Sequence, residues 1–108
     1  MKQLDEDGRF SFEVRGKTFC FHRRPRKDAP FDDVLVFRVD GPETKELLLA
    51  DPRGIFFTTP HWHGYPAVLM RIPALKQLPR AELREIVVDA WLARAPKRLA
   101  KAYLDATS

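Results

Sequence analysis

The sequence predicts a single α+β domain spanning residues 1–108, built on a mainly antiparallel sheet with helices packed on one face. Three observations support this class. Apolar and polar residues alternate over several short stretches, as they do in half-buried strands. An apolar repeat of helical period follows Pro79, and the elements come in the order strands, helix, strands, helices. A chain of 108 residues, 44% of them hydrophobic, can also bury a core of its own.

A hairpin is expected to open the sheet. Alternating apolar residues predict strands over residues 10–15 and 17–22, and Gly16 supplies an unusual φ at the turn between them. Simple alternation in the second strand sets Phe19 and Phe21 on the same face. The two faces are then Lys17, Phe19 and Phe21 against Thr18, Cys20 and His22.

A third strand and a helix are expected next. Residues 34–39 are rich in β-branched side chains, which is typical of a strand. The sequence Asp40-Gly41-Pro42 opens a helix, with either of its first two residues as the N-cap. Leu47 and Leu48 are expected on the buried side of this helix, which ends in the turn sequence of residues 51–54.

The second half of the chain predicts two short strands and then helices. The strands cover residues 55–58 and 67–72, joined by a connection of hairpin-loop length that contains two prolines. An amphipathic helical pattern then begins at Pro79, with apolar residues at i, i+3, i+4, i+7 and i+8. These are Leu83, Ile86, Val87, Ala90 and Trp91. Pro96 stops or kinks this helix, because it cannot donate a backbone hydrogen bond to residue 92, and a last short helix follows.

The charge distribution points to an anion-binding surface. The net charge is +4, but the basic residues gather in residues 15–27, which hold no acid, and in residues 94–101. The members are Arg15, Lys17, Arg23, Arg24, Arg26 and Lys27 in the first segment and Arg94, Lys97, Arg98 and Lys101 in the second. The second set falls on one face of a helix if the kink at Pro96 is mild. Either segment could contact phosphates or form a solvated face, and since neither supplies a base-reading pattern, any nucleic-acid binding is expected to be largely non-specific.

The stretch of residues 58–71 contains His61 and His63, which could be a metal site, a catalytic pair or part of a turn. Two imidazoles at i, i+2 can reach one ion, but zinc needs at least three protein ligands, and the nearest carboxylates, Asp51 and Glu82, are not close in sequence. We therefore expect no metal site. The favoured interpretation is a hairpin whose aromatic residues pack on the domain. The residues expected to line a pocket or a subunit contact are His61, Trp62, His63 and Tyr65.

No enzyme motif accompanies these features. Cys20 and His22 could in principle form a nucleophilic dyad, but a thiol between two phenylalanines is more often an apolar filler. The sequence also lacks a phosphate-binding loop and the common hydrolase motifs, so we expect neither a catalytic residue nor a cofactor. A single cysteine, no membrane-length apolar run and no export signal predict a cytoplasmic protein.

Two stretches, "GIFFTTPHWHGYPAVLMRI" and "AELREIVVDAWLARAPKRLAKAYL", together with the "RFSFEVRGKTFCF" hairpin, make the chain resemble the YjbR/MmcQ-like family of small bacterial DNA-binding-type proteins. The resemblance implies an α+β fold like that of the bacterial frataxin relatives, with a "double wing" arrangement described as DNA-binding. Members usually begin with a helix and a Leu-Pro-Gly turn. Here the first predicted strand begins about nine residues into the sequence. Either this member lacks that helix, or the start of the sequence is assigned too late.

Two functional hypotheses follow from the residues and the resemblance. The first is a non-enzymatic protein that binds DNA through the basic hairpin, the loop after it and the C-terminal helix. The second is a protein-interaction or small-ligand module that uses the hairpin of Trp62, His63 and Tyr65, with the basic segments keeping the surface solvated. The oligomeric state stays open between a monomer and a weak dimer.

Overall fold

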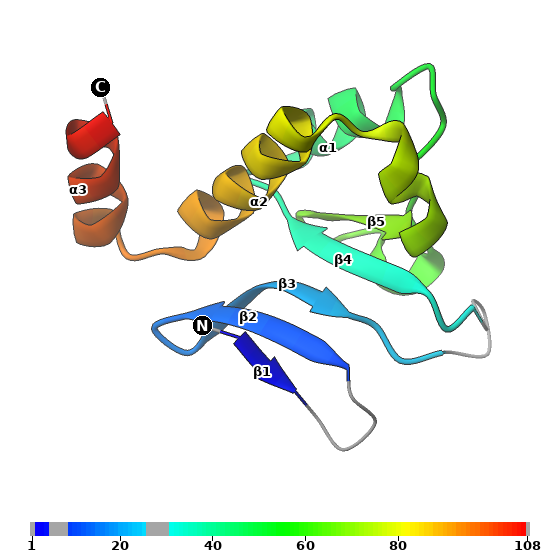
Figure 1. Cartoon of the computed structure of the whole chain (residues 1–108), viewed down its shortest axis with the longest axis horizontal. Coiled ribbons are helices and arrows are strands. Elements are labelled where there is room, and N and C mark those ends of the chain that lie inside the picture. The colour runs from blue at the N-terminus through cyan, green and yellow to red at the C-terminus, as the bar shows by residue number, and fades with distance from the viewer. Residues whose placement is uncertain (1, 5–8, 26–30, 108) are drawn as a thin grey trace.

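The computed structural model describes residues 2–4, 9–25 and 31–107. Within these residues five strands form one antiparallel sheet, in which each strand pairs with the next one along the chain (Figure 1). The strands are β1 (Lys2–Leu4), β2 (Phe10–Val14), β3 (Lys17–His22), β4 (Val34–Arg38) and β5 (Ala67–Arg71). The helices are α1 (Pro42–Leu49), α2 (Arg80–Arg94) and α3 (Lys97–Thr107), with 3-10 turns η1 (Pro60–Trp62) and η2 (Ile72–Gln77). The prediction of an α+β domain with a mainly antiparallel sheet is confirmed.

Two parts of the sheet differ from the prediction. β1 was not expected, and it forms by pairing with β2, Lys2 opposite Phe12. The strand predicted over residues 55–58 is reduced to one bridge, in which Phe57 and Leu69 exchange two backbone hydrogen bonds of 2.9 Å. The chain turns into η1 at Pro60, whose nitrogen has no hydrogen to donate, so the ladder does not extend.

A β-bulge in the first hairpin changes which side chains share a face. Cys20 is opposite Phe12 but Thr18 is opposite Glu13, which leaves Phe19 as an extra residue in β3. Phe19 and Cys20 consequently both join the core cluster beneath α2, whereas Phe21 packs with the cluster on the other side of the sheet. The expectation that Phe19 and Phe21 lie on the same face is wrong for this reason.

The helices begin and end close to their expected positions, with one error in orientation. α1 has Gly41 as its N-cap residue, and α2 ends at Arg94, two residues before Pro96. Leu48 packs against the core as expected, but Leu47 is 75% exposed. The buried position on α1 is taken by Lys45, which is 7% exposed.

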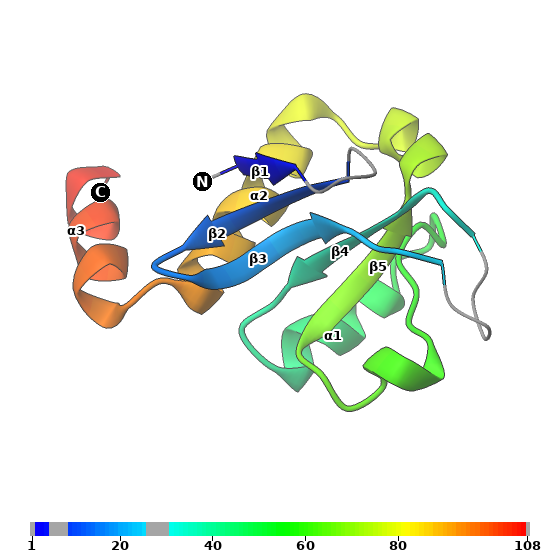
Figure 2. The ribbon, with the colours of Figure 1, turned by 90° about the horizontal axis from the view of Figure 1, so that it is seen from below.

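The core has two parts, one on each side of the sheet. α2 runs along β3 and β4 and covers the larger cluster, which includes Phe37 and Met70 (Figure 1). The smaller cluster on the opposite face, around Val36 and Leu69, is covered by Phe57 and Trp62 from the segment before β5. α3 stands apart from the sheet in both views (Figures 1 and 2). In the described part of the chain, no helix has both the length and the apolar character needed to cross a membrane.

Candidate nucleic-acid interface

The turn between β2 and β3 presents two of the predicted basic residues. Arg15 has a φ of 51° and Gly16 a φ of 80°, so both central positions are left-handed, as the tight turns favoured in hairpins require. Only Gly16 was expected to adopt such a conformation. The side chains of Arg15 and Lys17 are exposed at this turn.

Arg23 and Arg24 of the first basic segment do not join that turn. Arg24 is exposed, but Arg23 is 3% exposed and its Nη2 donates to the carbonyl oxygen of Phe31 at 3.1 Å. Arg23 therefore lies in the protein interior, away from the surface that phosphate binding needs. Arg23 and Arg24 both follow the last residue of β3. At a rise of about 3.3 Å per residue, that end of the strand is about 17 Å from the β2–β3 turn. Arg26 and Lys27 lie outside the described residues.

The second basic segment is divided between two helices. Ala95 has an extended conformation (φ −67°, ψ 144°), so α2 ends at Arg94 and α3 begins afresh at Lys97. The single helical stripe expected over residues 94–101 is therefore wrong. Within α3, Lys97 and Lys101 are four residues apart and share a face, and both are exposed, as is the neighbouring Arg98.

Arg38, the last residue of β4, lies close enough to Arg94 for the two positive charges to repel each other. Burial lowers the pKa of Arg38, the positive charge of Arg94 lowers that pKa further, and Tyr65 raises it. The Nε atoms of both arginines are buried and have no hydrogen-bond partner among the residues that the structure describes. No ion pair to a carboxylate is recorded for either side chain within those residues. Two neighbouring cations without an acidic partner repel each other, and an anion bound between them replaces this repulsion with attraction.

The topology brings these residues to one end of the sheet. Because β3 and β4 are antiparallel, the first residue of β3 and the last residue of β4, Arg38, lie at the same end. Both views place the β2–β3 turn and the α2–α3 junction on this side of the molecule (Figures 1 and 2). We call this group the basic end; its members are Arg15, Lys17, Arg38, Arg94, Lys97, Arg98 and Lys101.

The segment with the two histidines forms a compact aromatic turn. Trp62 is half-buried and packs on Phe21, with ring centroids 5.8 Å apart. Tyr65 is 50% exposed, and its ring stacks on His61 at 6.0 Å. His63 is exposed. Among the described residues, no three His, Cys, Asp or Glu side chains come together in a way that could hold a metal ion.

Lys45 of α1 holds this turn in place. Its Nζ donates to the carbonyl oxygens of Trp62 and Tyr65, both at 2.7 Å, and lies 3.4 Å from that of His63. These three acceptors match the three hydrogens of an ammonium group. Burial lowers the pKa of Lys45, which is the desolvation that the carbonyl oxygens offset. A lysine on a short helix gives no sequence signal for such a role.

The pair of Cys20 and His22, which the sequence does not favour as a nucleophilic dyad, has no activated thiol. Cys20 is 3% exposed, and burial raises the pKa of its thiol to about 12. A thiol of this kind stays protonated near neutral pH, whereas a nucleophile must ionise. His22 donates instead from Nε2 to the carbonyl oxygen of Asp32 at 2.5 Å.

Fold and site together define a small α+β protein with an antiparallel sheet and a cluster of basic side chains at one end of it. The chain belongs to the YjbR family, whose model matches residues 1–93. It is 42% identical over 81 residues to an uncharacterized protein of Mycobacterium bovis and to uncharacterized proteins of two strains of Mycobacterium tuberculosis. Each match covers 75% of this chain and 60% of the relative's length. No solved structure matches the chain significantly.

Proposed function

We propose that this protein is a cytoplasmic, non-enzymatic DNA-binding protein whose basic end contacts the phosphate backbone without reading base sequence. One observation carries the proposal. Arg38 and Arg94 are half-buried cations whose charges repel each other, no ion pair is recorded for either among the described residues, and a phosphate group placed between them would relieve that repulsion. The double-wing DNA-binding arrangement implied by the family resemblance agrees with this use.

The surroundings of the arginine pair extend the surface. Lys97 and Lys101 are exposed on α3, and Arg15 and Lys17 are exposed at the hairpin turn. Exposed cations spaced in this way can follow a backbone of regularly spaced phosphates. They supply affinity and orientation but no discrimination between bases.

The proposal is tested by equilibrium titration of the protein with labelled duplex and single-stranded DNA at salt concentrations from about 50 to about 200 mM. Four phosphate contacts, two from the arginine pair and two from the exposed cations, give a slope of log affinity against log salt of about −3.5. Arg38→Gln and Arg94→Gln should each reduce the magnitude of this slope by about 0.9, equally for different sequences.

Arg84→Gln is the matched control, because Arg84 is exposed on α2 about 15 Å along the helix from Arg94. It should leave the slope unchanged. An affinity that does not depend on salt, or no binding at micromolar duplex, would contradict the proposal. Equal losses in the control and in the two arginine variants would show that net charge alone, and not the basic end, drives binding.

A second candidate function, binding of another protein or a small ligand at the aromatic turn, is favoured by the exposure of Tyr65, whose ring stacks on that of His61. Half-exposed aromatic rings are common where proteins contact one another or a small ligand. Tyr65→Ala should then leave the salt slope for DNA unchanged and weaken self-association or partner binding. A reduced DNA affinity in this variant would instead assign the turn to the DNA surface.

A further inference from the structure

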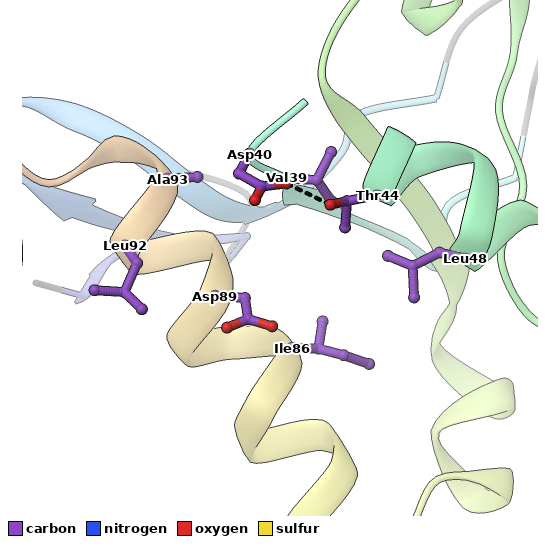
Figure 3. Close-up of a pocket in the computed structure, with 8 residues that line it drawn as sticks. All are labelled: Val39, Asp40, Thr44, Leu48, Ile86, Asp89, Leu92 and Ala93. Atoms are coloured by element: carbon purple, nitrogen blue, oxygen red, sulfur yellow. Dashed lines mark hydrogen bonds between the residues drawn. The ribbon is translucent and has the colours of Figure 1, made fainter. Parts of the chain in front are cut away.

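A pocket of about 270 Å³ opens between α1 and α2, beyond the end of β4 (Figure 3). Its lining residues are Val39, Asp40, Thr44, Leu48, Ile86, Asp89, Leu92 and Ala93. None of these belongs to the basic end or to the aromatic turn. The volume lies just under the range of about 300–1,000 Å³ that is usual for small-molecule sites, so a small ligand is the appropriate occupant.

Most of the pocket wall is apolar. Leu48 of α1 and Ile86 of α2 point toward each other across the opening, and Val39 comes from the end of the sheet between them (Figure 3). These three residues also contact or belong to the main core, so the wall is part of the fixed structure. A short hydrocarbon chain placed between the two helices would be removed from water on both sides.

The charged residues of the lining are both carboxylates. Asp40 accepts a hydrogen bond from Oγ1 of Thr44, which fixes its orientation (Figure 3). Asp89 is exposed on α2, and partial burial of its carboxylate raises its pKa, which the negative charges of Glu85 and Asp40 raise further. No ion pair between a basic side chain and Asp40 or Asp89 is recorded in the described part of the chain. The pocket therefore combines apolar walls with uncompensated negative charge.

We propose that this pocket binds a small organic cation, an alkylammonium group with a short apolar chain, with its nitrogen at Asp40 and Asp89 and its chain between Leu48 and Ile86. An anion is disfavoured by the two carboxylates. A bare divalent cation fits less well, because calcium and magnesium require six or more oxygen ligands, and most of this wall is hydrocarbon. An ammonium ion with a hydrocarbon chain satisfies both parts of the lining.

Titration of the 108-residue chain with hexylammonium chloride, followed by amide NMR shifts, tests this inference. Saturable shifts should be confined to residues 39–48 of the β4–α1 region and to residues 86–93 of α2. Binding should tighten by about fourfold for each methylene added from butyl- to hexylammonium. Hexanol and hexanoate, which present the same chain without a positive charge, should bind at least tenfold more weakly.

Asp89→Asn keeps the shape of the side chain and should weaken hexylammonium at least fivefold, and Asp40→Asn should do the same. Glu46→Gln is the control, since Glu46 is an exposed carboxylate of α1 that does not line the pocket. Melting temperatures of all three variants establish that each is folded.

Three results would overturn the inference. Hexanol binding as tightly as hexylammonium would show a merely apolar cavity. Magnesium producing the same local shifts, with none from hexylammonium, would show a metal site. Shifts spread over the acidic surface and reduced equally by Glu46→Gln would show non-specific attraction. None of these measurements depends on whether the basic end binds DNA.

Discussion

The ammonium group of Lys45 positions the turn that carries His61 and His63, because it donates to carbonyl oxygens on both sides of that turn. The sequence could not predict this. On a helix of eight residues with three consecutive leucines, the apolar pattern favours Leu47 as a buried residue, yet Leu47 is 75% exposed. A long aliphatic stem allows lysine to enter the interior wherever its charged end finds acceptors, and those acceptors lie about twenty residues away in sequence.

Lys45→Met should therefore destabilise the protein by at least about 2 kcal/mol, since it leaves the buried carbonyl oxygens of the turn without a donor. The measurement is chemical unfolding followed by tryptophan fluorescence, which reports on Trp62 in the same turn. Lys76→Met, at an exposed lysine of η2, provides the control and should change the free energy of unfolding little. Unfolding of Lys45→Met at the wild-type midpoint would show that the carbonyl oxygens find other donors.

The thiol of Cys20 should not react with a disulfide reagent in the native protein at pH 8. Its pKa of about 12 keeps it protonated, and its side chain lies beneath α2. Modification should become complete in denaturant, which a time course of thiol release would measure. Fast stoichiometric labelling under native conditions would instead show an accessible thiolate and would restore the dyad of Cys20 and His22 as a candidate.

At the scale of elements, local patterns predicted the strands and helices whose periodicity extends over at least five residues. β2, β4, β5 and α2 lie within one or two residues of their expected bounds. Features that depend on pairing were missed. β1 is three residues long and forms against β2, and the bulge at Phe19 shifts the register while leaving the alternating letters unchanged.

Arg53 joins two elements, and its contacts make a prediction about pH. Its side chain pairs with Asp51, in the turn after α1, at 2.7 Å and with Glu82, in the first turn of α2, at 2.8 Å. The hydrogen bond from Arg53 lowers the pKa of Asp51 to about 2, and it also lowers the pKa of Glu82. Both carboxylates thus have lower pKa values in the folded state than in the unfolded chain. Their contribution to stability is complete above the ordinary values of 3.8 and 4.5 and is lost as the pH falls toward about 2.

Arg53→Gln should accordingly unfold at lower urea concentration than the wild type at pH 6, and the difference between the two midpoints should shrink as the pH falls toward 2. Unfolding curves at several pH values measure this. Arg84→Gln, which replaces an exposed arginine of the same helix that Glu82 occupies, should show no such convergence. A constant difference across the pH range would mean that Arg53 acts through packing and not through its ion pairs.

For the whole molecule, the sequence identified where the basic residues gather along the chain but not which of them meet in space. Arg15, Lys17 and Arg94 were found, and the structure brings them toward one end of the sheet. Arg38 was missed because a single charge at the end of a β-branched strand carries no local signal. Arg23 was included although it is buried and donates to the carbonyl oxygen of Phe31, because neither property can be seen in the sequence. The order and direction of the strands decide which residues meet at one end of the sheet, and local sequence patterns do not show this.

α3 allows binding and stability to be separated, because its packing and its charge use different residues. The family match ends at residue 93, before this helix begins. Leu99 packs on the main core and Tyr103 on Trp91, with ring centroids 5.7 Å apart, while the basic side chains face outward. A triple variant with Lys97, Arg98 and Lys101 changed to Gln should keep the wild-type melting temperature and should reduce the magnitude of the salt slope for DNA by about 0.9 for each phosphate contact that α3 supplies. Tyr103→Ala should do the reverse, lowering the melting temperature by roughly 4–8 °C per kcal/mol of lost packing while leaving the slope nearly unchanged. If both variants changed both quantities together, α3 would act as one unit, and its basic residues could not be assigned to binding alone.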